Sequence, residues 1–386
     1  MNSSPSQHAP VIRRDPPRSI LVVRLGAMGD LIHAIAAASA LRAALPECKI
    51  GWVVEKRWSE LLCSLGFALR GERSRERPLV DDLFTVDIRT LRSNPVSPAT
   101  WKEMRTCFAE LRSVGYERVV DVQGAIRSAL IARLSGVAES WGESKPREAP
   151  AAIFYRHAVP FSGSHVAQQN LALMSAVAGI PLDDCAPLLP HDANSMKWCE
   201  QLLSDRSAPT RTTKAHSEDP FRFCILNPGA GWGAKCWPPS SFAEVAHRLA
   251  EVGLRSLVNF GPGEEHLAQQ VAEASGGAAE AISCSVSQLI ELTRRAEVFI
   301  GGDTGPMHLA AALGVPVVGL FGPTNPERNG PRGTRSVILR SRQSATSYHH
   351  TAIPDPALQS ISPAEVAAAA HTLLQQQNRA AVQETS

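Results

Sequence analysis

The chain has 386 residues, of which 44% are hydrophobic and 20% charged, and its formal net charge is +2. A chain of this length and composition is globular and long enough for two domains, each with its own core. The nearly balanced charge gives no support for bulk nucleic-acid binding, so we expect no nucleic-acid partner. The eight cysteines include no C-x-x-C pair and no zinc-type spacing, which indicates reduced thiols and no bound metal.

The N-terminus, residues 1–17, is polar and contains several prolines, and we expect it to be disordered. The apolar run that follows, Ile20–Val23, is far too short for a signal peptide or a membrane span. We therefore expect a cytoplasmic protein.

The first half of the chain alternates strand and helix patterns. Residues 20–23 predict a strand that ends at a glycine turn and leads into an apolar helix ending at Pro46. The elements predicted after it are a strand at 50–54, a strand at 83–88, a helix at about 98–114 and a strand at 118–122. This alternation predicts an α/β domain with a mostly parallel, doubly wound sheet, which we assign to residues 18–203.

A second α/β series follows the polar residues 204–220, which have no apolar periodicity and are the predicted linker. The strands predicted beyond it lie at residues 223–226, 256–260, 298–300 and 315–320. We assign residues 221–350 to a second domain. Ser362, Pro363 and Glu365 then begin a helix with a capping box, and we expect this helix, residues 360–380, to pack back on the first domain.

The most informative motif is Gly301–Leu309, which follows an apolar strand and opens an alanine-rich helix. A strand that stops at glycines and leads into a helix exposes unpaired backbone N–H groups, which form an anion site. Asp303, Thr304 and His308 surround this spot with carboxylate, hydroxyl and imidazole groups. The combination predicts a site for a phosphorylated, hydroxyl-rich ligand such as a nucleotide sugar.

The turn Leu25–Asp30 lacks the G-x-G-x-x-G spacing of dinucleotide sites, which argues against an NAD-dependent oxidoreductase. Two interpretations of Asp30 stay open. It is either a helix cap, the commoner role for an Asp at a helix start, or a general base. A carboxylate at the carboxyl end of a strand would lie where doubly wound sheets bind ligands.

A second glycine-rich loop, residues 227–238, leaves room for phosphate near the backbone, and Lys235 supplies the positive charge. The loop is not a Walker loop, and a flexible surface loop with a solvated lysine is the alternative. We expect Trp237, beside two prolines, to pack in the protein. Glu264 and Glu265 also follow a strand, where a carboxylate either accepts ribose hydroxyl groups or complements the helix dipole.

Two further segments carry candidate residues. In residues 121–128, Gln123 and Arg127 either meet an acceptor or cap a helix. The arginine-rich residues 70–77 also contain two glutamates, so a solvated loop is the default interpretation. Docking of an acidic, phosphorylated acceptor is the alternative.

Together these blocks resemble one family, the ADP-heptose lipopolysaccharide heptosyltransferases of glycosyltransferase family 9, and are closest to heptosyltransferase I. The resemblance rests on residues 25–33, 121–124, 227–238, 302–312 and 321–324. It implies the GT-B architecture, two Rossmann-like domains facing a cleft, with the acceptor on the first and the nucleotide sugar on the second. It implies no bound metal and no other cofactor.

The resemblance also implies roles for single residues. Asp30 looks like the catalytic base of an inverting transfer, and Lys235 looks like the residue that neutralises the diphosphate. Glu265 falls at the place of an acidic residue for the ribose, with Glu264 as the register alternative.

Around the Gly301–Leu309 motif, the same resemblance implies that Thr304 and Gly305 bind phosphate. It implies that Asp303 holds heptose hydroxyl groups and that His308 lies near the phosphates. In the first domain, Gln123 and Arg127 are the candidates for binding the acceptor.

The implied function is transfer of heptose from ADP-heptose to Kdo-lipid A, in the inner core of lipopolysaccharide. The protein would act at the inner face of the cytoplasmic membrane, as a peripheral partner of its surface. The alternatives are a related family 9 transferase with another acceptor or sugar, similar to heptosyltransferase II, and a non-catalytic nucleotide-sugar-binding protein.

Overall fold

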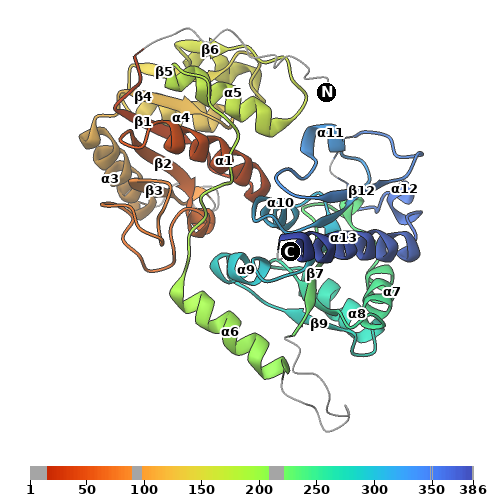
Figure 1. The fold of residues 1–386 in the computed structure, drawn as a ribbon. Coiled ribbons are helices and arrows are strands. Elements are labelled where there is room, and N and C mark those ends of the chain that lie inside the picture. The colour runs from red at the N-terminus through yellow and green to blue at the C-terminus, as the bar shows by residue number, and fades with distance from the viewer. Residues whose placement is uncertain (1–14, 89–97, 208–220, 348, 350, 385–386) are drawn as a thin grey trace. The chain divides into compact units, whose positions relative to one another are not determined.

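The computed structural model describes residues 15–88, 98–207, 221–347, 349 and 351–384. The chain divides into two compact units, Met1–His191 and Asp192–Ser386. Each unit contains one six-stranded parallel sheet flanked by helices (Figure 1). The doubly wound α/β fold expected for both halves is therefore confirmed.

The first sheet has the spatial order β3-β2-β1-β4-β5-β6. Its strands are β1 (Ser19–Val23), β2 (Lys49–Glu55), β3 (Asp82–Val86), β4 (Arg118–Asp121), β5 (Glu139–Glu143) and β6 (His157–Val159). The helices around it are α1 (Met28–Ala44), α3 (Pro98–Val114), α4 (Ile126–Leu134) and α5 (Val166–Ala178), with short 3-10 helices η1 (Lys56–Leu61) and η2 (Ala149–Phe154). Residues 20–23 of β1 are fully buried, as a central strand covered on both faces requires.

The second sheet has the order β12-β11-β10-β7-β8-β9. Its strands are β7 (Phe223–Asn227), β8 (Arg255–Asn259), β9 (Ala279–Ile282), β10 (Val298–Gly302), β11 (Val317–Phe321) and β12 (Ser336–Arg340). The helices are α6 (Ala193–Ser207), α7 (Pro239–Ala250), α8 (Glu265–Ala274), α9 (Val286–Thr293), α10 (Gly305–Ala312), α11 (Pro326–Asn329), α12 (Pro356–Gln359) and α13 (Pro363–Glu384), with the 3-10 helix η3 (Gly233–Lys235).

Both sheets share one topology, because each begins at a central strand, runs to one edge, and returns to the other side of that central strand. The order reverses between β1 and β4 in the first sheet and between β7 and β10 in the second. Ligands of doubly wound sheets bind outside the carboxyl ends of the strands at such a switch point. The segments that follow these four strands contain all the predicted site residues except Glu265.

Helices cover both faces of the second sheet. Alternate residues of its strands point to opposite faces, so Leu226 and Ile300 belong to one core and Ile225 and Phe299 to the other. The first of these cores contains residues of α7, α8 and α13, and the second contains residues of α6, α9 and α10.

Two boundary expectations need correction. The division between the units falls at residues 191 and 192, earlier than the predicted end of the first domain at 203. The reason is that α6 packs against α9 and buries Cys199 in a core of the second unit. Of the predicted linker, residues 204–207 belong to α6, and 208–220 lie outside the described residues, as do 1–14 of the predicted disordered N-terminus.

The C-terminal helix was expected on the first domain, whereas α13 packs on the second sheet. Its apolar side, which includes Val366, Ala370 and Leu373, is buried in the core that also holds α7 and α8. The predicted capping box is confirmed, since the Glu365 N–H donates to Ser362 Oγ over 3.2 Å and the Ser362 N–H donates to Glu365 Oε2 over 3.0 Å.

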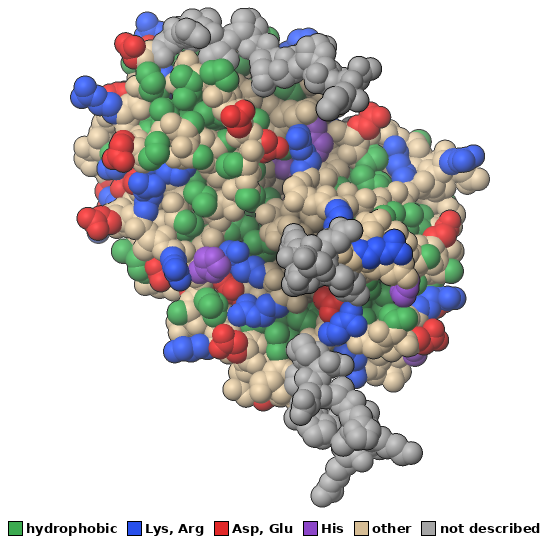
Figure 2. Space-filling model, viewed as in Figure 1, with side chains coloured by type: hydrophobic (Ala, Val, Ile, Leu, Met, Phe, Trp, Pro, Cys, Tyr) green, Lys and Arg blue, Asp and Glu red, His purple; other side chains and the backbone are tan. Residues whose placement is uncertain are grey.

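The charged side chains of the surface and the state of the cysteines agree with the near-neutral charge and the cysteine spacing of the sequence. On the face drawn in Figure 2, basic and acidic side chains are interspersed. All eight cysteines are free, and burial raises the pKa of several of their thiols, to about 12 for Cys224. Within the part of the chain that the structure describes, no helix is long and apolar enough to cross a membrane.

Candidate functional site

The loop after β7 is held in place by two asparagines at the ends of neighbouring strands. Asn259 donates its amide to Asn227 Oδ1 over 2.7 Å, and Asn227 donates its own amide to the Gly229 carbonyl over 2.8 Å. Both side chains are buried. The glycine-rich loop is therefore anchored at its start.

Lys235 lies at the end of this loop, in η3, and points back into the protein. Its Nζ donates to Asp303 Oδ2 over 2.9 Å and to the Asp303 carbonyl over 3.0 Å. It also lies 5.4 Å from the centroid of the Trp232 ring, within reach of a cation–π contact. Because the Lys235 side chain is only 15% exposed, the alternative of a solvated lysine on a flexible loop is wrong.

Asp303 connects this lysine with a histidine. Its second carboxylate oxygen, Oδ1, lies 3.1 Å from His308 Nε2, and both side chains are buried. Burial alone would raise the pKa of the Asp303 carboxyl, but the hydrogen bonds and charges of His308 and Lys235 outweigh it and hold that pKa well below its usual range. The structure thus brings Lys235, Asp303 and His308 together in one charged cluster.

The same cluster borders the start of α10. Thr304 occupies the N-cap position, but its side chain does not cap the helix and Thr304 Oγ1 donates to the Gly302 carbonyl over 3.3 Å. The backbone N–H groups of the first turn have no acceptor within a helix, so an uncapped start leaves them available to an anion. Thr304 and Gly305 are half-buried and stand at this start, as the anion-site prediction requires.

The structure separates the two candidate glutamates. Glu264 precedes α8 and accepts a hydrogen bond from the Gly261 N–H over 2.9 Å. A Cβ placed on Gly229 would collide with the Glu264 carboxylate, so this side chain lies directly against the glycine loop. Glu265 is the first residue of α8 and is exposed. Glu264, the register alternative, is therefore the acidic residue next to the loop that holds Lys235.

In the first unit, Asp30 is the third residue of α1, and Ala27 occupies the N-cap position. The helix-cap interpretation of Asp30 is therefore wrong. Instead, Asp30 Oδ2 lies 2.5 Å from Arg24 Nη2, and the Asp30 side chain is 39% exposed. This leaves a fixed carboxylate that faces solvent at the carboxyl end of β1.

Arg24, a buried cation, fixes Asp30 to the sheet. The Arg24 side chain is only 8% exposed, and its Nη1 donates to the Val122 carbonyl, beyond the end of β4, over 2.7 Å. The two segments of the switch point, after β1 and after β4, are thus linked through one guanidinium. Sequence reasoning missed Arg24, although an arginine at the end of a buried strand is an unusual residue to place there.

The segment after β4 has a structural role. Gln123 is buried and its Oε1 accepts the Leu25 N–H over 2.9 Å, which ties this segment to the turn before α1. Asp121 accepts hydrogen bonds from the Gln123 N–H over 2.9 Å and the Tyr155 hydroxyl over 2.7 Å, and burial raises the pKa of its carboxyl. Arg127, in the first turn of α4, is exposed. Neither Gln123 nor Arg127 caps α4, because the N-cap residue is Ala125.

Trp237, at the end of the glycine-rich loop, packs as expected. It is 2% exposed, and its ring meets that of Phe242 edge-on, with 5.0 Å between the centroids. Its Nε1 donates to the Ile361 carbonyl over 3.2 Å, which fixes the approach to α13.

Two Rossmann-like domains, one with an uncapped helix start beside a buried lysine and the other with an exposed carboxylate, are typical of enzymes that transfer a group from a nucleotide-activated donor. The model of glycosyltransferase family 9 (heptosyltransferase) matches residues 104–356. The chain belongs to this family and is a glycosyltransferase, which confirms the resemblance predicted from the motifs.

Individual relatives agree over most of the chain. Lipopolysaccharide heptosyltransferase 1 of Pseudomonas aeruginosa is 29% identical over 327 residues, 83% of this chain and 83% of its own length. Lipopolysaccharide heptosyltransferase 1 of Escherichia coli K12 is 26% identical, over 83% of this chain and 93% of its own length. Similarity to heptosyltransferase 2 of Salmonella typhimurium covers 40% of this chain, at 31% identity.

Solved structures share the fold. E. coli heptosyltransferase WaaC with ADP has a TM-score of 0.70 at 22% identity, covering 92% of this chain and 99% of that one. E. coli ADP-heptose lipopolysaccharide heptosyltransferase II has a TM-score of 0.71 at 19% identity, covering 93% and 99%. The GT-B fold class is thereby confirmed. Among the residues that the structure describes, no group of three His, Cys, Asp or Glu side chains could hold a metal ion.

Proposed function

We propose that this glycosyltransferase moves heptose from ADP-heptose to Kdo-lipid A, in the inner core of lipopolysaccharide. The observation that carries the proposal is the cluster of Lys235, Asp303 and His308 beside the uncapped start of α10. The names of the relatives support the sugar and the pathway, and a solved structure of WaaC with ADP-2-deoxy-2-fluoro heptose supports the donor.

The second domain would bind the donor. The diphosphate would lie at the start of α10, where the N–H of Gly305, the Thr304 hydroxyl and the helix dipole favour negative charge. Lys235 would neutralise the diphosphate, and His308 would lie close to it. Glu264, directly against the glycine loop, is better placed than Glu265 to accept hydrogen bonds from the ribose.

Asp303 would act first as a positioning residue. Its two carboxylate oxygens hold Lys235 Nζ and His308 Nε2, so it sets where both side chains can reach. A carboxylate has about four lone-pair sites, so Asp303 can also accept a hydroxyl group of the heptose.

The first domain would supply the base. Asp30 would accept the proton of the acceptor hydroxyl. At the same time the hydroxyl oxygen of the acceptor would form a bond to the anomeric carbon of the heptose. The bond from that carbon to the β-phosphate oxygen breaks, and ADP leaves with the electron pair, stabilised by Lys235 and the start of α10. Attack on the face opposite the leaving group inverts the anomeric centre. Gln123 and Arg127 remain the candidates for contacts with the acceptor.

The place of action would be the inner face of the cytoplasmic membrane, where a lipid-anchored acceptor is held, with the protein bound peripherally. A heptosyltransferase II-like activity is the competing proposal.

The test is an assay of the full chain with ADP-heptose and Kdo-lipid A that follows ADP release and the mass of the product. The proposal expects turnover with this pair and none with UDP-glucose. Turnover only on an acceptor that already carries its first heptose would replace the proposal with a heptosyltransferase II-like activity. ADP binding without turnover on any core acceptor would reject the proposed acceptor.

A further inference from the structure

The segment between η1 and β3 exposes a run of apolar residues. Leu65 is 70% exposed, Phe67 37% and Leu69 40%, and these are three of the ten large hydrophobic side chains that are exposed among the described residues. They lie within five consecutive residues, Leu65–Leu69, at the edge of the first sheet, since β3 is an edge strand (Figure 1). Consecutive exposed apolar residues are costly in water unless something covers them.

This apolar loop, as we call Leu65–Leu69, is held by a buried arginine. Arg77 is fully buried, and its guanidinium donates to the carbonyls of Ala68 over 2.6 Å and Gly71 over 2.6 Å. The Leu83 N–H, at the start of β3, donates to the Leu69 carbonyl over 2.7 Å. The default interpretation of residues 70–77 as a solvated loop is therefore wrong for Arg77, and the apolar loop is presented by a fixed scaffold.

Basic residues flank the apolar loop in the sequence, and we call those between Lys56 and Arg77 its basic border. From Lys56 to Arg77 the chain has six Lys or Arg residues and three Glu residues, whereas the whole chain is almost neutral. Of the six, Lys56, Arg57, Arg70, Arg73 and Arg75 are exposed. An apolar protrusion with a basic border matches the surface of an anionic bilayer, whose headgroups attract cations and whose interior takes up apolar side chains.

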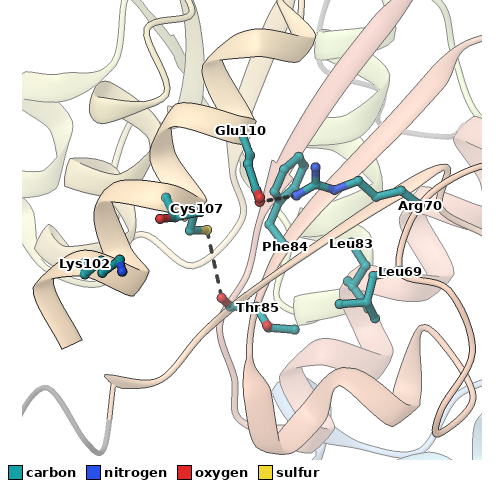
Figure 3. Close-up of a pocket in the computed structure, with 9 residues that line it drawn as sticks. Leu69, Arg70, Leu83, Phe84, Thr85, Lys102, Cys107 and Glu110 are labelled. Atoms are coloured by element: carbon teal, nitrogen blue, oxygen red, sulfur yellow. Dashed lines mark hydrogen bonds and ion pairs between the residues drawn. The ribbon is translucent and has the colours of Figure 1, made fainter. Parts of the chain in front are cut away.

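A cavity of about 470 Å³ opens beside the apolar loop, between β3 and α3. Leu69, Leu83 and Phe84 form its apolar wall, and Arg70 and Lys102 stand at its border (Figure 3). The Arg70 guanidinium lies 4.6 Å from the centroid of the Phe84 ring and pairs with Glu110. The cavity extends the apolar surface inward from Leu69, and the charged residues of its lining are Arg70, Lys102 and Glu110.

We propose that the apolar loop Leu65–Leu69 and its basic border dock the first domain on an anionic phospholipid bilayer. Leu65 and Phe67 enter the interface, and the surrounding arginines and lysines contact phosphate headgroups. The docking surface adds a membrane contact to the proposed function. Its biological role rests on that function, because a lipid-anchored acceptor is what would bring the enzyme to a membrane. Its physical content does not depend on which sugar or acceptor the enzyme uses.

The test is sedimentation of the full chain with vesicles of phosphatidylglycerol and phosphatidylethanolamine, beside vesicles of phosphatidylcholine. Wild type should partition to the anionic vesicles and lose most of this binding at high salt. The double variant Leu65→Ser/Phe67→Ser should lower the partition coefficient roughly 100-fold, because each apolar side chain moved out of water contributes about tenfold. Arg75→Gln should weaken anionic binding roughly fivefold.

The matched controls are Val252→Ser/Ile353→Ser, at side chains that are 45% and 74% exposed in the second unit, and Arg335→Gln, at another exposed arginine. Both should bind vesicles as wild type does. Calorimetric titration with ADP and the temperature of thermal unfolding show whether each variant is folded. If the double variant is not folded, the single variant Leu65→Ser replaces it in the test.

Failure of wild type to bind anionic vesicles overturns the inference, as does equal loss in the control variants. A concentration-dependent dimer that Leu65→Ser abolishes, without vesicle binding, would assign the apolar loop to a second copy of the chain and also overturn it. Vesicle binding without turnover on Kdo-lipid A would leave the docking surface standing and reject the proposed function. Turnover on a soluble, deacylated acceptor without vesicle binding would support the proposed function and reject the docking surface.

Discussion

The two sheets have the same strand order, yet their switch points differ in chemistry. At the first, between β1 and β4, Arg24 fixes Asp30 so that its carboxylate stays 39% exposed. At the second, between β7 and β10, the carboxylate of Asp303 is buried and engages Lys235 and His308. One topology therefore carries an exposed carboxylate in one domain and a buried cluster of Lys235, Asp303 and His308 in the other.

The difference comes from the loops and not from the strands. The turn after β1 is short and leads at once into α1, so the charged group it carries lies in the first turn of a helix. The loop after β7 is longer and rich in glycine, which lets Lys235 fold back to the end of β10. In each domain the candidate functional residues thus lie on loops and helix starts, and the same arrangement of strands holds those segments in place.

The largest expected effect is on turnover at the first switch point. Asp30→Asn removes the proton acceptor and keeps the size of the side chain, so kcat should fall roughly 100- to 10,000-fold. Steady-state assays of ADP release measure it, with Asp183→Asn, at an exposed acid, as the control. Activity close to that of wild type in Asp30→Asn would show that Asp30 is not the catalytic base.

At the second switch point, Asp303→Asn should destabilise the fold by about 3 kcal/mol, because the cations of a buried cluster lose their carboxylate. The lowered pKa of Asp303 fixes the sign of the pH dependence. The advantage of wild type over the variant should be full above the ordinary Asp pKa of about 4 and should shrink as pH falls toward the lowered value. Denaturant unfolding between pH 6 and 3 measures it, and a gap that grows with acid would contradict the cluster.

Lys235→Met should weaken ADP binding about 10- to 100-fold, since a hydrogen bond to a charged group contributes roughly 1.5–3 kcal/mol. Calorimetric titration with ADP measures the loss. The exposed Lys197, changed to Met, is the matched control and should bind ADP as wild type does. Equal affinities in both variants would move the diphosphate away from Lys235.

Arg24 should act through Asp30 without touching ADP. Arg24→Met should lower kcat about tenfold and leave ADP affinity close to that of wild type, because Asp30 loses the guanidinium that fixes its carboxylate. Arg24→Lys keeps a cation at this place and should retain more of the activity. Equal losses of kcat in both variants, together with a loss of ADP affinity, would make Arg24 a purely structural residue.

The smallest effect separates the two glutamates. Glu264→Gln should weaken ADP binding about fivefold, the size of one ordinary hydrogen bond, and Glu265→Gln should change it by less than twofold. The same titration compares them. A larger loss in Glu265→Gln would restore the original assignment of the ribose contact.

The sequence predicted the elements that are long or strongly apolar. Strands β1, β2, β7 and β10 are near-continuous apolar runs, and α3 matches its predicted range of about 98–114. Strands β5, β6, β9 and β12 were missed, because they are short, polar or partly exposed and lack a clear period. The capping box predicted the N-terminus of α13. The sheet on which α13 packs could not be predicted, because an apolar helix face fits either sheet.

Within the candidate site, local motifs were sufficient for residues next to glycine turns and insufficient for contacts across strands. Asp303, Thr304 and His308 are consecutive or one turn apart, so their grouping could be predicted. The link from Arg24 to the Val122 carbonyl depends on the register of the parallel strands β1 and β4. The choice of Glu264 over Glu265 depends on which side of α8 faces the loop after β7, which only the fold determines.

The most direct test of the account measures ADP affinity and single-turnover rate together in Asp30→Asn and Lys235→Met. We expect a separation: Asp30→Asn should bind ADP within about twofold of wild type and lose the chemical step, and Lys235→Met should lose affinity for ADP. Loss of ADP binding in Asp30→Asn, with normal binding in Lys235→Met, would contradict the division of base and anion site between the two domains.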